Sequence, residues 1–208
     1  GTDVDLIFGG TGNDSLYGEA GNDIIYAKAG NNVINGGTND DTIYAGTGVD
    51  NIDGGADNDT IYAKAGNNIL NGGINNDVIY VGTGRDAVDG GADTDTLRFD
   101  GGTQRVVVNL GTTSLSYDST SIAANSFVNS WLTGGNTGSI QTGTVINVEN
   151  VDGTNFDDTI RGNDLRNIIK TGSGDDYIIA SLGNDEVHGG VHTANKGDWV
   201  DFSFITTQ

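Results

Sequence analysis

The chain contains no cysteine, no proline and no methionine, and it has few basic residues. The lack of cysteine excludes a disulfide framework and a cysteine nucleophile. Lysine and arginine number 9 against 29 aspartates and glutamates, which gives a net charge of −20. A chain this acidic is a poor partner for nucleic acid or an anionic membrane surface. No apolar run approaches the roughly 18 residues of a transmembrane helix, so no membrane span is predicted.

Signatures of catalysis are missing as well. The sequence has no H-E-x-x-H helix of a zinc protease and no G-x-S-x-G nucleophile elbow. Its glycine-rich stretches lack the Lys-Ser/Thr ending of a phosphate-binding loop, and their acidity would repel phosphate. His188 and His192 lie four residues apart, but we expect no glutamate or cysteine to complete a transition-metal site with them, and predict a surface loop. The sequence therefore predicts that this chain is not an enzyme.

Glycine and carboxylates dominate the residues that are present. The 208 residues include 35 glycines, and the charge of −20 makes a compact form of the chain repel itself. A chain of this kind is either disordered or binds cations. Aliphatic residues recur in it at a fixed spacing, which favours a folded protein that binds cations.

A repeat of nine residues runs through residues 9–98 in ten copies, without insertion or deletion. The first copy reads GGTGNDSLY and the last reads GGADTDTLR. Position six is always Asp or Asn. Position eight always carries an aliphatic side chain: Leu16, Ile25, Ile34, Ile43, Ile52, Ile61, Leu70, Ile79, Val88 and Leu97. Residues 1–8 fit a further copy that lacks only its first residue, so we expect the chain to be a fragment of a longer protein.

Each copy divides into a turn and a short strand. Positions one to six are rich in Gly, Asn and Asp, which tolerate left-handed backbone conformations. Positions seven to nine are mostly β-formers, with position eight pointing inward and its neighbours outward. A strand of about three residues buries no face by itself, so neighbouring copies must stack, with two copies to a coil and about 4.8 Å between coils. The period predicts an all-β protein built as a parallel β-roll.

The repeat matches the pattern G-G-x-G-x-D-x-U-x, and the sequence resembles the RTX (repeats-in-toxin) β-rolls of secreted toxins, proteases, lipases and alginate epimerases. The resemblance implies a right-handed parallel β-roll that holds several Ca²⁺ ions between turns on the same side. The resemblance also implies which oxygen atoms bind each calcium ion. One turn supplies the carbonyls of positions two and four and the position-six Asp, and the next turn on that side supplies the carbonyls of positions one and three and its own Asp.

One side of the roll carries Asp at every position six, and we call its turns the all-Asp row: Asp5, Asp23, Asp41, Asp59, Asp77 and Asp95. By the resemblance, five calcium sites follow, formed by Gly1, Asp3 and Asp5 with Gly18, Ala20 and Asp23; by Glu19, Gly21 and Asp23 with Gly36, Thr38 and Asp41; by Gly37, Asn39 and Asp41 with Gly54, Ala56 and Asp59; by Gly55, Asp57 and Asp59 with Gly72, Ile74 and Asp77; and by Gly73, Asn75 and Asp77 with Gly90, Ala92 and Asp95. Position four is often Asn or Asp here where the family prefers Gly, a conservative change because both tolerate the left-handed region.

The opposite side alternates Asp with Asn, and we call its turns the mixed row: Asp14, Asn32, Asp50, Asn68 and Asp86. Its first turn also offers the carbonyls of Gly10 and Gly12. Each gap between turns would hold one carboxylate and one amide, with Lys28 or Lys64 near some of them. The Asn amides have an alternative, because they can hydrogen-bond to neighbouring turns without a metal. We therefore predict weaker calcium binding in the mixed row, or none.

The outward side chains differ between the two sheets of the roll. On one sheet, position nine forms a series that we call the Tyr face: Phe8, Tyr26, Tyr44, Tyr62, Tyr80 and Arg98. On the other sheet the series is mostly acidic and amide: Tyr17, Asn35, Asp53, Asn71 and Asp89. An exposed aromatic series can bind a polysaccharide or mediate self-association. The same series is also compatible with tyrosines that simply stack well in a ladder, or with a face that the long loop after residue 100 covers.

After residue 98 the period breaks, and Phe99 and Asp100 are expected to close the roll. Residues 106–110 and 145–151 read as strands, and between them residues 112–144 carry Phe127, Trp131 and Leu132, too apolar for a free linker, so we expect this segment to pack on or beside the roll. The period resumes at residue 153 for four copies and a widened fifth that ends at residues 198–201. Its position-six residues predict a calcium site at Asp158 and Asp176 and a poorer one at Asn167 and Asp185. Phe202 and Phe204 resemble Phe99 as end-cap aromatics.

These features predict three segments: a first roll over residues 1–100, a non-repeat insertion over 101–152, and a second roll with an aromatic cap over 153–208. The resemblance implies a calcium-binding structural or adhesive module of a secreted or cell-surface bacterial protein, exported unfolded by type I secretion and folded by calcium outside the cell. The segment VENVDGT also resembles the C-terminal regions of secreted RTX proteases, so the alternative is an accessory module of a secreted enzyme that precedes residue 1. An ice-binding module is a third interpretation, weakened because position three alternates Thr and Ala.

Overall fold

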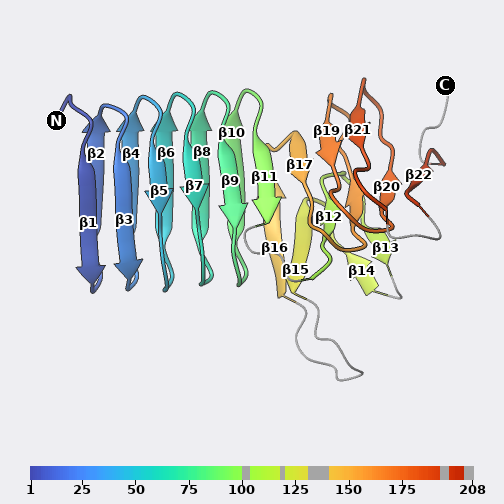
Figure 1. Ribbon diagram of the computed structural model, residues 1–208, viewed down its shortest axis with the longest axis horizontal. Helices are drawn as coiled ribbons and strands as arrows, with labels where there is room; N and C mark the ends of the chain where they lie inside the picture. Colours follow the sequence, from blue (N-terminus) through green and yellow to red (C-terminus); the bar gives the residue numbers. More distant parts are fainter. Residues whose placement is uncertain (100–103, 118–119, 131–140, 193–196, 204–208) are drawn as a thin grey trace. The chain divides into compact units, whose positions relative to one another are not determined.

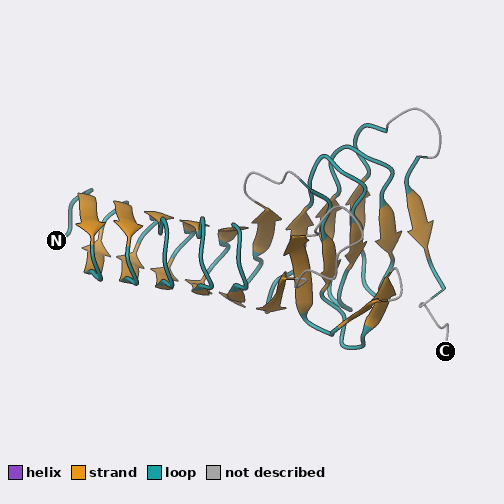
Figure 2. Cartoon of the chain, turned by 90° about the horizontal axis from the view of Figure 1, so that it is seen from below, coloured by secondary structure: helices purple, strands orange, loops and turns teal. Residues whose placement is uncertain are grey.

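The computed structural model describes residues 1–99, 104–117, 120–130, 141–192 and 197–203. Strands and loops make up this part of the chain, without a helix (Figure 2). Consequently, none of the described residues belongs to a helix long and apolar enough to span a membrane. The chain divides into two compact units, Gly1–Asp100 with Ile146–Val148, and Gly101–Val145 with Glu149–Gln208.

The first unit is a parallel β-solenoid whose strands alternate between two sheets (Figure 1). The first sheet holds β1 (Leu6–Thr11), β3 (Ile24–Ala29), β5 (Thr42–Tyr44), β7 (Thr60–Tyr62), β9 (Val78–Val81) and β11 (Thr96–Phe99). The second sheet holds β2 (Ser15–Ala20), β4 (Val33–Thr38), β6 (Asn51–Ala56), β8 (Ile69–Ile74) and β10 (Ala87–Ala92). Every pairing joins residues 18 apart, as in Ile25↔Ile43 and Ile34↔Ile52, so the predicted coil of two copies is confirmed.

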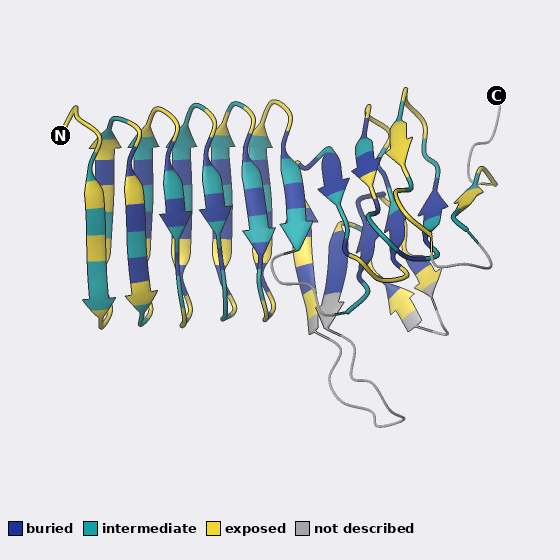
Figure 3. Cartoon of the chain, in the orientation of Figure 1, coloured by how far each residue is buried: buried dark blue, intermediate teal, exposed yellow. Residues whose placement is uncertain are grey.

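Position eight forms the core of this unit, as predicted (Figure 3). The side chains of Ile25, Ile43 and Ile61 are fully buried, and Ile34, Ile52 and Leu70 on the other sheet are 1% exposed. With one such residue per copy, each contributing about 1.5–3 kcal/mol on burial, the apolar core is thin. The rest of the stability has to come from the turns.

The strands of the second sheet are longer than the sequence predicts. Strands β2, β4, β6, β8 and β10 each run six residues and continue through positions one to three of the following copy, with register pairs such as Gly37↔Gly55 and Thr38↔Ala56. The prediction of about three residues is wrong here. A glycine at position two, such as Gly37 with φ 117°, lets the chain stay in the ladder while it bends toward the turn.

The second unit combines a smaller parallel solenoid with antiparallel strands. One sheet contains β17 (Asn150–Asp152), β19 (Ile168–Lys170) and β21 (Glu186–His188). The other contains β16 (Gln141–Ile146), β15 (Ser126–Ser130), β12 (Val107–Asn109), β18 (Thr159–Arg161), β20 (Tyr177–Ile179) and β22 (Trp199–Asp201), with β15 antiparallel to both β16 and β12. A hairpin of β13 (Leu115–Tyr117) and β14 (Thr120–Ile122) completes the unit.

The insertion packs into this second unit. Leu115 and Ile122 of the hairpin form a core cluster with Val107, Val128 and Ile179, and Phe127 is fully buried. The expectation that the segment packs on a roll is therefore confirmed for its described part, while Trp131 and Leu132 lie outside the described residues. The predicted strand 106–110 is confirmed as β12.

Two predictions near the ends of repeats are wrong. The single strand predicted over 145–151 is two strands, β16 and β17, because the chain turns at Asn147, which has a φ of 51°. Phe202 is 64% exposed, so it does not cover the end of the solenoid as predicted. Phe99 ends β11 and is partly buried, while Asp100 and Phe204, also expected to close the rolls, lie outside the described residues. The widened last copy is confirmed, since Trp199 pairs with Tyr177 in a parallel ladder.

Candidate metal centre

The turns of the first unit depend on left-handed backbone at positions two and four. Position four of the all-Asp row has a φ of 77° at Asn39, 78° at Asp57, 80° at Asn75 and 81° at Asp93. Like Gly21 at the same position, with φ 125°, these residues have a positive φ, so their interpretation as conservative replacements is confirmed. Position two is left-handed as well, even where it is Glu19 or Lys28, with φ 78° and 73°.

The carboxylates of the all-Asp row are buried one above another. Asp23, Asp41, Asp59, Asp77 and Asp95 are each 1–2% exposed. In each of them Oδ1 accepts the backbone N–H of the equivalent residue in the preceding coil, at 2.6 Å from Asp5, 2.7 Å from Asp23 and 2.8 Å from Asp41, Asp59 and Asp77. One oxygen of every carboxylate therefore links successive turns.

The second carboxylate oxygen, Oδ2, is also buried but accepts no such hydrogen bond. Oδ2 of Asp23, Asp41, Asp59 and Asp77 has no hydrogen-bond partner among the described residues. A buried carboxylate oxygen left unsatisfied costs free energy unless a proton or a cation reaches it. Four successive turns repeat this arrangement, which identifies the Oδ2 atoms as the place where a cation is needed.

The glycines at position one lie beside these oxygens and carry no side chain that would collide with them. A Cβ placed on Gly36 would lie 2.5 Å from Asp41 Oδ2 and 2.5 Å from the Gly54 carbonyl oxygen of the next turn. The corresponding points lie 2.5 and 2.3 Å from such oxygens at Gly18, 2.5 and 2.4 Å at Gly54, and 2.4 and 2.3 Å at Gly72. None of these four glycines has a positive φ, so the close approach of these two oxygen atoms, which leaves no room for a Cβ, explains them better than backbone freedom does.

Burial raises the pKa of the middle carboxylates. Desolvation, together with the charges of neighbouring aspartates, raises the pKa of Asp59 to about 8, and desolvation is the main cause of the pKa of about 6 at Asp41 and Asp77. Asp59 therefore resists ionisation at neutral pH unless a cation compensates it, and Asp41 and Asp77 ionise less readily than a free aspartate does. Among the described residues no three His, Cys, Asp or Glu side chains converge, so most ligand oxygens would have to be backbone carbonyls.

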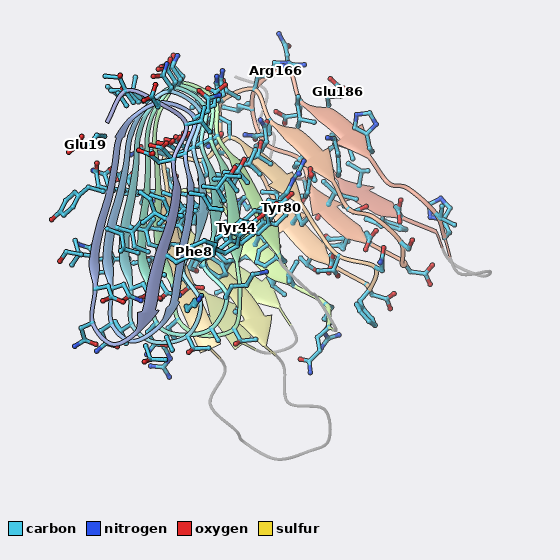
Figure 4. The ribbon with its side chains drawn as sticks, turned by 60° about the vertical axis from the view of Figure 1, so that its left-hand side comes forward. Phe8, Glu19, Tyr44, Tyr80, Arg166 and Glu186 are labelled. Atoms are coloured by element: carbon cyan, nitrogen blue, oxygen red, sulfur yellow. The ribbon has the colours of Figure 1, made fainter. Side chains whose placement is uncertain are left out.

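The first predicted site of the row has a different environment. The Asp5 side chain is 46% exposed, whereas Asp23 in the next turn is buried. Glu19 lies near this end of the unit in Figure 4. Solvent therefore reaches the carboxylate of Asp5.

In the mixed row, hydrogen bonds satisfy the Asn amides and one oxygen of Asp50 and of Asp86, while Oδ2 of Asp14, Asp50 and Asp86 is buried without a hydrogen-bond partner among the described residues. The Asn32 and Asn68 side-chain amides donate to Asp50 Oδ1 and Asp86 Oδ1, both at 2.9 Å. Burial still raises the pKa of Asp50 and Asp86, although the amide donors act in the opposite direction. Position one of this row is Ala27, Ala45, Ala63 or Val81 after Gly9, and each of these side chains is at most 1% exposed. After Gly9, position one of this row therefore carries a buried side chain where the all-Asp row has glycine.

This difference at position one is visible in the sequence, but the prediction of weak binding compared position six and the lysines at position two. The prediction also placed lysines near the metal-binding turns of the mixed row, and this is wrong. Lys28 Nζ lies 5.1 Å from the centroid of the Phe8 ring, and Lys64 Nζ lies 5.1 Å from that of Tyr62. Both ammonium groups therefore lie against the Tyr face, where the π electrons of the aromatic rings attract a cation.

In the second unit, Asp158 has the donors that Asp41 lacks. Its Oδ1 accepts the Val106 N–H at 2.7 Å, and its Oδ2 accepts the Thr154 N–H at 2.6 Å. The Thr154 hydroxyl donates to the same carboxylate at 2.9 Å from Oδ1. Burial nevertheless raises the pKa of Asp158 to about 7. Thr154 thus supplies hydrogen bonds where a calcium ion would bind, and the site predicted at Asp158 and Asp176 stays a prediction.

The poorer site predicted in the second unit is also hydrogen-bonded. Asn167 Nδ2 donates to the Glu149 carbonyl at 2.7 Å and to Asn163 Oδ1 at 2.9 Å, while Asp185 Oδ2 accepts from Ser181 Oγ at 3.1 Å. The two histidines each have a carboxylate partner. His188 Nε2 lies 2.8 Å from Glu186 Oε1, and His192 Nδ1 lies 3.3 Å from Asp198 Oδ1. Glu186 therefore lies beside His188 on β21, two residues apart, and the expectation that no glutamate completes a transition-metal site with the two histidines stays a prediction.

The family model for the RTX calcium-binding nonapeptide repeat (4 copies) matches residues 1–34, 27–61, 35–70, 71–103 and 152–187. A search of curated proteins gives no match. The matched segments cover most of the chain and contain both the all-Asp row and the mixed row. With the parallel solenoid and the buried position-six carboxylates, the match shows that the chain belongs to the family of RTX calcium-binding nonapeptide repeat proteins.

Proposed function

We propose that this chain is a calcium-triggered structural and adhesive module of a secreted or cell-surface bacterial protein. The observation that carries the proposal is the row of buried Oδ2 atoms at Asp23, Asp41, Asp59 and Asp77, which have no hydrogen-bond partner among the described residues. Calcium there supplies the positive charge that holds the carboxylates together. Because the site does not exist in the unfolded chain, the free energy of binding is also free energy of folding.

The charge of the chain supports folding outside the cell. At a net charge of −20 the metal-free chain repels itself, and its thin apolar core offers little to oppose the repulsion. A chain of this kind stays unfolded where calcium is scarce and folds where calcium is abundant. Extracellular calcium modules bind with dissociation constants of about 10⁻⁴–10⁻³ M, which suits this switch.

Circular dichroism during a calcium titration tests the proposal. We expect little β-structure in the presence of a chelator at pH 7.5 and a cooperative gain of β-structure as calcium is added. Magnesium at the same concentration is the control, because it demands a smaller octahedral site and releases its water reluctantly. A spectrum that is the same in chelator and in calcium would refute calcium-triggered folding.

The Tyr face is the surface that we propose for adhesion. The rings of Phe8, Tyr26, Tyr44, Tyr62 and Tyr80 stack with centroid separations of 4.4–5.3 Å and interplanar angles of 4–14°. Phe8 is 55% exposed and the four tyrosines are half-buried. Figure 4 shows Phe8, Tyr44 and Tyr80 along one side of the unit. A continuous series of aromatic rings is therefore within reach of a partner.

The stacking of the aromatic rings limits how a partner can bind to the Tyr face. Each ring covers the face of its neighbour, so a sugar has little ring face on which to stack, while ring edges and hydroxyl groups point outward. This geometry favours a second copy of the chain over a polysaccharide. We expect sedimentation in calcium to show association that is lost in the double variant Tyr44→Ser/Tyr62→Ser and kept in the control Asn35→Ser/Asn71→Ser on the other sheet. A monomeric parent chain that binds polysaccharide would favour the other partner.

A further inference from the structure

The last turn of the all-Asp row meets a residue from outside the repeat. At earlier turns, the space beside the position-one glycine is bounded by the carbonyl oxygen of the next such glycine. A Cβ placed on Gly90 would instead lie 2.0 Å from the Asn147 carbonyl oxygen, and 2.6 Å from Asp95 Oδ2. Asn147 therefore stands where the position-one carbonyl of a further copy would be.

Asn147 is fixed in this orientation by its backbone and by its side chain. Its φ of 51° is left-handed, and its Nδ2 donates to Asp89 Oδ1 at 2.8 Å, on the strand that leads into Gly90. The neighbouring Val148 is 2% exposed, and Ile146–Val148 belongs to the same compact unit as the turn. The carbonyl is thus held against the turn by three separate features.

The turn itself has the geometry of its predecessors. Asp95 is 1% exposed, and Gly91 and Asp93 at positions two and four have φ values of 109° and 81°, as their equivalents do in the preceding turns. Gly90, like the earlier position-one glycines, has no positive φ. Its lack of a side chain keeps open the space between two oxygen atoms.

We propose that this turn and Asn147 form an additional calcium site that closes the all-Asp row. Its ligands are the Asp95 carboxylate, the carbonyls of Gly91 and Asp93, and the Asn147 carbonyl, and water completes the six to eight oxygens that calcium takes. The ion fastens the segment Ile146–Val148 to the end of the repeat. This inference rests on the proposed function, since it requires that the row binds calcium.

Counting calcium ions by native mass spectrometry of the whole chain tests the site. Gly90→Ala puts a methyl group in the space, and Asn147→Val removes the left-handed conformation that presents the carbonyl, because a β-branched residue does not adopt it. We expect each variant to bind one ion fewer than the parent chain. The double variant should also bind one ion fewer, because both changes act on one site.

Asn147→Gly is the matched control. Glycine keeps the left-handed conformation and the carbonyl while it loses the bond to Asp89, so the parent number of ions is expected. Circular dichroism in saturating calcium checks that each variant folds, and the Asn147 pair decides the question if Gly90→Ala does not fold. Unchanged numbers in Gly90→Ala and Asn147→Val, a loss of two ions in the double variant, or a loss in Asn147→Gly would overturn the site. A parent chain that binds no calcium would instead refute the proposed function.

Discussion

The all-Asp row and the mixed row of the first unit share one backbone arrangement but differ in how their buried turns are stabilised. Both bury their position-six side chains, and both link successive turns by an Oδ1 that accepts a backbone N–H. They differ in what fills the space beside the second oxygen. In the all-Asp row that space lies between Oδ2 and a carbonyl oxygen beside a glycine such as Gly54. In the mixed row the equivalent position carries a buried side chain, such as that of Ala45.

The difference shows two ways to stack buried turns of the same shape. A column of carboxylates repels itself and needs a cation between each pair. A column that alternates Asp with Asn has fewer carboxylates and supplies a donor to one oxygen of Asp50, the 2.9 Å bond from Asn32 Nδ2 to Oδ1, although Oδ2 of Asp50 has no partner among the described residues. The mixed row therefore needs fewer cations to form once the other row has folded. Each copy supplies one turn and one strand to the same coil. Calcium bound in the all-Asp row would therefore fold both sheets.

Neutralising one aspartate in each row gives the largest contrast. Asp59 faces the gaps on both sides of its turn, so Asp59→Asn should weaken two calcium sites. At calcium concentrations about 100 times the dissociation constant, each lost ion costs about 2.7 kcal/mol, so the free energy of unfolding should fall by about 5 kcal/mol. Asp50→Asn should change it by less than about 1 kcal/mol, because no ion is lost. Urea unfolding in saturating calcium measures both, and equal losses in the two variants would contradict the distinction.

Exchanging the position-one residues should give a smaller effect. Gly54→Ala places a methyl group 2.5 Å from Asp59 Oδ2 and 2.4 Å from the Gly72 carbonyl, so it should remove one ion and about 2.7 kcal/mol of stability in calcium. Ala45→Gly should cost about 0.5–1 kcal/mol through backbone entropy, without adding an ion. Isothermal titration calorimetry gives the number of ions for each variant. A glycine at position 45 that creates a new calcium site would show that position one, and not position six, sets the asymmetry.

The pH dependence should have opposite signs with and without calcium. In the metal-free chain, the pKa of Asp59 is raised to about 8 and those of Asp41 and Asp77 to about 6. The folded state therefore binds protons that the unfolded state releases above about pH 4, and its stability is lost as the pH rises through 6 to 8. We expect more β-structure at pH 5 than at pH 8 in chelator. In calcium the order should reverse, because protons compete with the ion.

Circular dichroism at the two pH values, with and without calcium, distinguishes these cases. The variant Asp59→Asn is the control, because it removes the group with the largest shift and should flatten the metal-free trend. Metal-free stability that rises from pH 5 to pH 8 would contradict the burial of un-neutralised carboxylates.

Much of the first unit could be predicted because the period is local information. The inward direction of residues such as Ile43 and the register of 18 residues follow from the spacing of aliphatic side chains, and both are confirmed. The six-residue strands could not be predicted in the same way. Whether a Gly-Gly segment such as Gly36-Gly37 continues a ladder depends on the neighbouring coil, which the propensity of glycine does not reveal.

The segments outside the repeat were harder to predict because their contacts are distant in sequence. Residues 145–151 read as one apolar strand, and the turn at Asn147 contacts Asp89, 58 residues away. Likewise, the donors that satisfy Asp158 come from Thr154, within the copy, and from Val106, 52 residues earlier in the chain. Position one of the repeat is a different case, since the glycines of one row and the alanines of the other stand plainly in the sequence.

A calcium-bound crystal structure with the ions located by anomalous scattering tests the central claim most directly. We predict ions between the turns of Asp23 and Asp41, Asp41 and Asp59, Asp59 and Asp77, and Asp77 and Asp95. We predict none between Asn32 and Asp50 or between Asn68 and Asp86. Equal occupancy of the gaps in the two rows would contradict the account.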